Sequence, residues 1–128
     1  MTQTPCVIAI VDDDTSLRRA LVRLLRTMGY QAVAFASAEA FLQAGLQMPL
    51  DCLVLDMWLS GMSGVAFLEH LVALGSTLPV ILITGRYDIQ TRLHAAQMGA
   101  VAYLRKPLDE QDLRQSLQRA LGKKASAC

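Results

Sequence analysis

The sequence predicts an α/β protein built on a parallel β-sheet, and three observations lead to this fold class. Short apolar runs alternate five times with longer segments whose apolar residues recur at helical spacing. The first run, at 6–11, is continuous and rich in β-branched residues, as in strands that are covered by helices on both faces. The chain has 128 residues, of which 53% are hydrophobic and 18% charged, so we expect one domain with a substantial core.

The strand predicted at 6–11 is followed by an amphipathic helix. Asp14 is a suitable N-cap, because its carboxylate can accept hydrogen bonds from the free N–H groups of the first turn. Gly29 is suited to the left-handed conformation that ends many helices. The apolar positions between them recur every three or four residues: Leu17, Ala20, Leu21, Leu24, Leu25 and Met28.

The second and third units follow the same plan. A strand at 31–35 precedes a short helix that Ser37 caps and Gly45 ends. The third strand, at 51–56, ends on a carboxylate. A glycine-rich loop at 61–64 then leads into the third helix.

The last two units complete the predicted sheet. Strands are expected at 79–84 and 101–104, and the helices that follow them begin after Asp88 and Asp109. Five such units and the right-handed crossover rule favour a single doubly wound sheet with five helices and the flavodoxin-like strand order 2-1-3-4-5. The final helix buries leucines that lie on one stripe: Leu113, Leu117 and Leu121.

Composition sets the boundaries and excludes several classes of function. The domain is expected to span 5–122, with 123–128 as a C-terminal tail. The formal charge of +1 gives no general attraction to nucleic acid or membranes. No apolar stretch is long enough to span a bilayer and no signal peptide is evident, so we expect a cytoplasmic protein.

Polar residues gather at the predicted carboxyl ends of the strands. Asp12 and Asp13 follow the first strand, Asp56 ends the third, Thr84 ends the fourth and Lys106 follows the fifth. In open α/β sheets, ligands bind at this edge where the strand order reverses. These side chains are therefore expected to share one pocket.

Three carboxylates in one pocket need a counter-charge. Two of them ~4 Å apart repel by about 4 kcal/mol at an effective dielectric near 20, so the site holds either a shared proton or a cation. Oxygen ligands in a half-open site are typical of Mg²⁺. With Lys106, the metal could gather the oxygens of a transferring phosphoryl group, to which Thr84 could donate a hydrogen bond.

Each of these residues also has a simpler explanation. Acidic residues after a strand favour the N-terminus of the next helix. Taken singly, Asp56 could be a loop acid, Thr84 a strand-end hydroxyl and Lys106 a solvated surface charge. Their joint placement, one feature for each strand end on the same edge, favours a common site.

The motifs together resemble the signatures of response-regulator receiver domains of two-component signalling, over residues 6–121. The runs at 37–42 and 79–85, with 98–100, are similar to the FixJ-like branch of that family. The five motifs are Val11-Asp12-Asp13-Asp14, Leu53-Val54-Leu55-Asp56, Gly61-Met62-Ser63-Gly64, Ile83-Thr84-Gly85 and Leu104-Arg105-Lys106-Pro107.

The resemblance implies an acceptor and a metal site. Asp56 would accept a phosphoryl group from a phosphohistidine of a sensor histidine kinase. The domain would catalyse its own phosphorylation and slow dephosphorylation, and would not be an enzyme in the usual sense. Asp12, Asp13, Asp56 and the backbone carbonyl of Trp58 would hold Mg²⁺ or Mn²⁺.

The resemblance also implies a switch. Lys106 would pair with Asp56 or its phosphoryl group, and the bond to Pro107 would be cis. Thr84 would move toward the phosphoryl group and Tyr103 would rotate inward behind it. The face made by the fourth helix, fifth strand and fifth helix would then change, and in this family that face dimerises or docks an output domain that regulates transcription. No direct contact of this chain with nucleic acid or a membrane is implied.

The loop after Asp56 departs from the family pattern. The family usually has Met-Pro where this chain has Leu59-Ser60, and the loss of a proline frees φ and restores an N–H. A more mobile loop is therefore expected. Trp58 either shields the phosphoryl group from water or packs on Leu59 or a neighbouring loop, and the sequence leaves both open.

Two other classes of protein place related chemistry on this fold. A Mg²⁺-dependent phosphohydrolase also uses a strand-end Asp, but usually with a second Asp two residues later, where this chain has Trp58. A flavin or nucleotide binder would need a phosphate-cradling loop after the first strand, where the Asp triplet would repel phosphate. FixJ-like receivers usually precede a helix-turn-helix domain that this chain lacks, so it is either a stand-alone regulator or part of a longer transcription factor.

Overall fold

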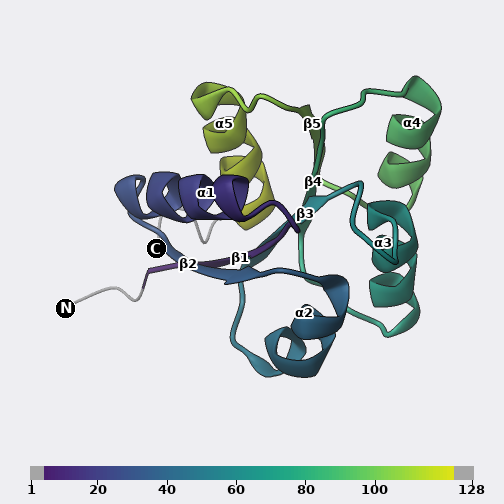
Figure 1. Ribbon diagram of the computed structural model, residues 1–128, viewed down its shortest axis with the longest axis horizontal. Coiled ribbons are helices and arrows are strands. Elements are labelled where there is room, and N and C mark those ends of the chain that lie inside the picture. The colour runs from purple at the N-terminus through teal and green to yellow at the C-terminus, as the bar shows by residue number, and fades with distance from the viewer. Residues whose placement is uncertain (1–4, 123–128) are drawn as a thin grey trace.

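Five parallel strands form one sheet in the order β2-β1-β3-β4-β5 in a computed structural model that describes residues 5–122 (Figure 1). This confirms the predicted α/β fold class and strand order. The predicted tail, 123–128, lies outside the described residues. The strands are β1 (Val7–Val11), β2 (Gln31–Phe35), β3 (Cys52–Asp56), β4 (Val80–Thr84) and β5 (Ala102–Arg105). The helices are α1 (Thr15–Thr27), α2 (Ala38–Ala44), η1 (Gly45–Gln47), α3 (Gly64–Ala73), α4 (Ile89–Gln97) and α5 (Glu110–Leu121).

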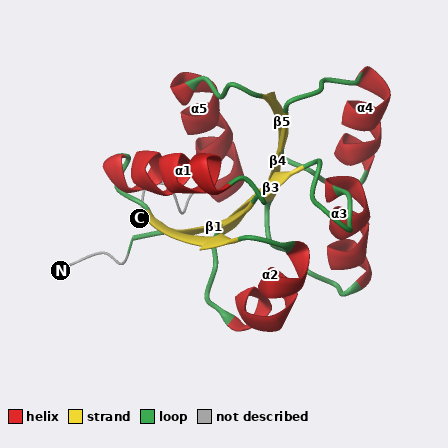
Figure 2. Ribbon diagram, in the orientation of Figure 1, coloured by secondary structure: helices red, strands yellow, loops and turns green. Residues whose placement is uncertain are grey.

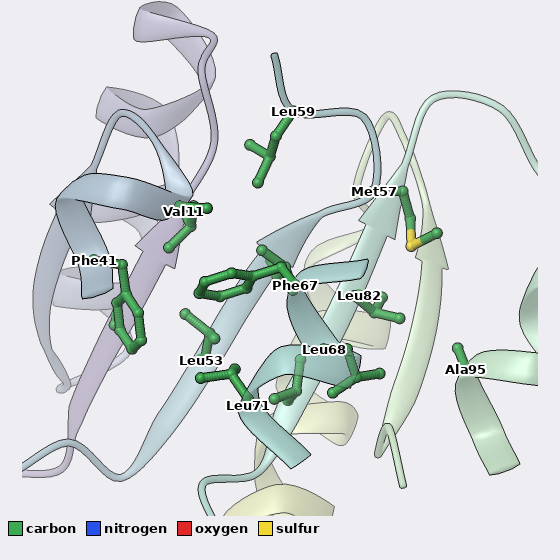
Figure 3. Close-up of a cluster of buried hydrophobic side chains, with 14 residues drawn as sticks. Val11, Phe41, Leu53, Met57, Leu59, Phe67, Leu68, Leu71, Leu82 and Ala95 are labelled. Carbon is green, nitrogen blue, oxygen red and sulfur yellow. The ribbon is translucent and has the colours of Figure 1, made fainter. Parts of the chain in front are cut away.

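Helices cover both faces of the sheet, which explains the continuous apolar runs (Figure 2). On one face, α1 and α5 pack their leucines against Ile8, Ile10 and Ile83. On the other, α2, α3 and α4 pack against alternate residues of the same strands (Figure 3). Phe41 and Phe67 meet edge to face there, with ring centroids 5.6 Å apart. Each central strand is thus buried on both sides.

The predicted N-caps are confirmed at the four helices for which the sequence names one. Asp14, for example, accepts hydrogen bonds from the backbone N–H groups of Ser16 and Leu17, at 2.9 and 3.2 Å. These bonds satisfy donors that have no partner within the helix. Among the strands, β5 begins and ends one residue later than the sequence predicts. The other three caps are Ser37, Asp88 and Asp109.

Gly45 follows α2 for a reason that cannot be read from the sequence. Its φ of −71° is right-handed, and the chain continues into η1 instead of turning sharply away. A Cβ at this position would lie 2.5 Å from the ring of Phe41, which is fully buried. Gly45 is therefore required by the close packing of the core and not by a positive φ.

Within residues 5–122, none of the helices combines the length and the apolar character that crossing a membrane requires.

Candidate functional site

Three carboxylates meet at the carboxyl edge of the sheet. β1 and β3 are paired with Val11 opposite Leu55, and this register places Asp12 beside Asp56. One oxygen from each of Asp12, Asp13 and Asp56 lies within 4.8 Å of the others. Asp12 and Asp56 are buried whereas Asp13 is exposed, so the group is open to solvent on one side.

Burial opposes the charge of Asp12. Its side chain is inaccessible to solvent, and this desolvation raises the pKa of the carboxyl above its ordinary value. The backbone N–H of Asp14, which donates to Asp12 Oδ1 at 2.9 Å, acts in the opposite direction. The neighbouring charge of Asp56 raises the pKa again, and the ammonium of Lys106 lowers it. The site thus places negative charges close together in a buried environment, which is unfavourable for the ionised carboxylates and is expected where a cation binds.

Lys106 supplies a positive charge to two of the carboxylates. Its Nζ lies 3.3 Å from Asp12 Oδ2 and 3.4 Å from Asp56 Oδ1. The Lys106 backbone N–H donates to the carbonyl oxygen of Thr84 at 2.6 Å, which fixes the loop against the end of β4. The Lys106–Pro107 peptide bond is cis, in agreement with the expectation from sequence.

Gly64 allows the first turn of α3 to approach the end of β3. A Cβ on Gly64 would lie 2.6 Å from the backbone oxygen of Asp56 and 2.7 Å from the Cα of Met57. The Gly64 N–H donates to the carbonyl oxygen of Met57 at 2.7 Å, and a β-bridge joins Trp58 to Ser63. The loop after the acidic strand is therefore tightly closed, and only glycine fits at its end.

Ser60 ties this loop to the carboxylate of Asp13. The backbone N–H and the hydroxyl of Ser60 both donate to Asp13 Oδ2, at 3.2 and 3.0 Å. A proline at position 60 would have no N–H to donate. The residue from which we expected a looser loop thus makes two hydrogen bonds in it. The sequence shows that position 60 departs from the family pattern, but it does not show that Ser60 bonds to Asp13, 47 residues away.

Thr84 and Trp58 are in direct contact. The indole Nε1–H of Trp58 donates to Thr84 Oγ1 at 3.1 Å, and the Trp58 backbone N–H donates to Asp56 Oδ1 at 3.3 Å. The guanidinium of Arg86 lies over the indole, 5.4 Å from its centroid. Trp58 is 52% exposed and Leu59 is buried. Of the two packing partners that the sequence left open for Trp58, the structure therefore shows the neighbouring loop.

Tyr103 lies on β5 and packs against the buried cluster that includes Ala95 of α4. Its ring meets the ring of Tyr87 edge to face, with centroids 5.6 Å apart. The guanidinium of Arg105 lies 4.6 Å from the centroid of the Tyr87 ring. Arg92 of α4 donates to the Tyr87 hydroxyl at 3.1 Å. Tyr103 thus belongs to an aromatic and arginine cluster on the α4–β5–α5 face, with β5 at the edge of the sheet between the two helices (Figure 1).

Comparison with known sequences gives a consistent result. Residues 8–118 match the sequence family described as the response regulator receiver domain. Nodulation protein W of Bradyrhizobium diazoefficiens is 41% identical over 110 residues, which are 86% of this chain and 48% of that protein. The transcriptional regulatory protein FixJ of Azorhizobium caulinodans is 34% identical over 116 residues, which are 91% of this chain and 55% of FixJ. The chain spans about half the length of these relatives.

Comparison with solved structures agrees. The crystal structure of FixJ-N superposes with a TM-score of 0.84 at 32% identity, covering 92% of this chain and 94% of that one. A response regulator receiver domain protein from Clostridium thermocellum superposes with a TM-score of 0.86 at 26% identity, covering 96% of this chain and 99% of that one.

Proposed function

This chain belongs to the response regulator receiver domain family, and on that premise we propose that Asp56 is the residue at which it accepts a phosphoryl group. The observation that carries the proposal is the position of the Asp56 carboxylate. It is buried at the end of a central strand, 3.4 Å from Lys106 Nζ and next to two more carboxylates.

The donor set fits a divalent cation that prefers oxygen. Asp12, Asp13 and Asp56 offer carboxylate oxygens within 4.8 Å of one another, and the exposed side of the cluster leaves room for water. We assign these three residues as the ligands of Mg²⁺ or Mn²⁺, with the backbone carbonyl of Trp58 as a further ligand. The bound ion would neutralise charge on the phosphoryl oxygens during transfer.

Asp56 and Lys106 have separate roles in the transfer of the phosphoryl group. An oxygen of Asp56 forms the new O–P bond as the N–P bond of a phosphohistidine breaks, and the imidazole leaves with the electron pair of that bond. Lys106, placed between Asp12 and Asp56, offers its ammonium to the same phosphoryl oxygens. The donor is a sensor histidine kinase, and the domain itself catalyses acceptance and slow hydrolysis.

Phosphorylation then acts on the α4–β5–α5 face. It adds about −1.5 to −2 charge and new acceptor oxygens to a small pocket. Thr84 donates to the phosphoryl group and Tyr103 moves inward behind it, which changes a face that dimerises or docks an output domain. Two relatives are named as transcriptional regulators and the chain spans about half of each. We therefore infer that the output is the regulation of transcription.

Mass spectrometry of the intact protein tests the proposal. Incubation with acetyl phosphate and Mg²⁺ is expected to add one phosphoryl group to the wild type and none to Asp56→Asn. Chelation of the metal should also prevent the addition. Continuous release of phosphate, without accumulation of a modified protein, would support a phosphohydrolase instead and contradict the assignment. The presence of Trp58, and not an Asp, two residues after Asp56 argues against that alternative.

A further inference from the structure

The hydroxyl of Thr84 has no hydrogen-bonding capacity left. A hydroxyl has one proton to donate and two lone pairs that accept. Thr84 Oγ1 donates to the carbonyl oxygen of Arg86 at 2.8 Å and accepts from the Arg86 N–H at 3.0 Å. It also accepts from the indole N–H of Trp58 at 3.1 Å. Since Thr84 is fully buried, giving up any of these bonds without replacing it has a cost.

Trp58 is held in place from both ends. Its backbone N–H donates to Asp56 Oδ1 at 3.3 Å, and its backbone is joined to Ser63 by a β-bridge. Its ring lies under the guanidinium of Arg86. One residue therefore contacts the acceptor carboxylate through its backbone and the Thr84 hydroxyl through its side chain.

We propose that Trp58 is a positioning residue that latches Thr84 in the unphosphorylated state by holding its hydroxyl toward Arg86 and away from Asp56. The inference rests on the function proposed above. Thr84 has a single proton, which it cannot give to a phosphoryl oxygen and to the Arg86 carbonyl at the same time. To donate to the phosphoryl group, the hydroxyl must break its hydrogen bond to the Arg86 carbonyl oxygen. The same movement misaligns the hydrogen bond that it accepts from the indole N–H of Trp58.

The latch also connects the site with the α4–β5–α5 face. The backbone N–H and the carbonyl oxygen of Arg86 both bond to the Thr84 hydroxyl, and Arg86 directly precedes Tyr87 in the chain. Tyr87 contacts Arg92 of α4 and both Tyr103 and Arg105 of β5. Release of Arg86 by Thr84 frees the segment that carries Tyr87. The indole hydrogen bond therefore opposes the switch as well as the movement of Thr84.

The test uses Trp58→Phe, which removes the indole N–H together with part of the ring but keeps an aromatic ring for Arg86. The probe is beryllofluoride in the presence of Mg²⁺, a stand-in for the phosphoryl group, titrated into isotope-labelled protein. The backbone amide signal of Arg86 in NMR spectra reports the switch in both proteins. One net hydrogen bond corresponds to about a threefold to tenfold change in an equilibrium constant, so Trp58→Phe should reach its midpoint at a concentration lower by that factor.

A second pair of proteins shows whether the effect passes through Thr84. Thr84→Ala removes the hydroxyl, so adding Trp58→Phe to it should leave the midpoint unchanged. An unchanged midpoint for Trp58→Phe alone overturns the latch, and so does an equal shift in the Thr84→Ala background. If acetyl phosphate modifies wild-type Asp56 in the mass experiment, either result refutes the latch alone. If wild-type Asp56 is not modified, the proposed function fails and the latch fails with it.

Discussion

Two loops at the carboxyl edge of the sheet border the acidic cluster, and they are held in different ways. The β1–α1 loop is fixed by bonds between close neighbours: the Asp14 N–H donates to Asp12 Oδ1, and Asp14 in turn caps α1. The β3–α3 loop has local bonds of its own but is also tied to distant partners: Trp58 binds a residue 26 positions away and Ser60 one 47 positions away. The first loop is therefore shaped mainly by local bonds, although Asp13 also accepts hydrogen bonds from Ser60, whereas the second loop depends more on contacts with other strand ends.

Gly64→Ala perturbs the β3–α3 loop and should have the largest effect on stability. The added Cβ would meet two backbone atoms, at 2.6 and 2.7 Å, and backbone cannot rotate away as a side chain can. The first turn of α3 must then move away from the end of β3. We expect a loss of about 3 kcal/mol in the free energy of unfolding, measured by urea denaturation.

Gly85→Ala is the matched control at the same edge. A Cβ there has no neighbour within 4 Å among the described residues, so the free energy of unfolding should change by less than about 1 kcal/mol. Equal losses from the two substitutions would show that close approach does not hold the β3–α3 loop.

Asp14→Ala perturbs the β1–α1 loop and should have a smaller effect on stability. It removes a cap that satisfies two N–H groups at the start of α1, which costs about 1 kcal/mol in the free energy of unfolding. Asp109→Ala removes an equivalent cap from α5, outside the acidic cluster, and should cost the same. Urea denaturation of both variants makes the comparison. A much larger loss at Asp14 would mean that the β1–α1 loop depends on the cluster and is not held locally.

The same difference explains what could be predicted from the sequence. The helices, their caps and the strands depend on residues a few positions apart, and their predicted positions agree with the structure to within one or two residues. The gathering of Asp12, Asp13, Asp56 and Lys106 follows from a rule about strand order, because strand ends meet wherever the topology places them.

Contacts between side chains on different loops were not predictable in this way. The bonds from Ser60 to Asp13 and from Trp58 to Thr84 depend on the path of the β3–α3 loop, which has no periodic pattern. Gly64 is visible in the sequence as part of a motif, but its closeness to Asp56 follows only from the packing of α3. Ser60 is visible in the sequence as a departure from the family pattern, but the hydrogen bonds that it makes to Asp13 are not.

Ser60→Ala should have the smallest effect, because it removes one of the two donors to Asp13 and keeps the backbone N–H. Groups that orient a ligand from outside the metal's own ligand set contribute to metal affinity. We expect the midpoint of a Mg²⁺ titration to rise about threefold. The titration is monitored by the fluorescence of Trp58, which is the only tryptophan in the sequence. Ser60→Thr, which keeps the hydroxyl, should restore the wild-type midpoint. An unchanged midpoint for Ser60→Ala would mean that Asp13 needs no support from the second loop, and the two loops would then be independent at the metal site.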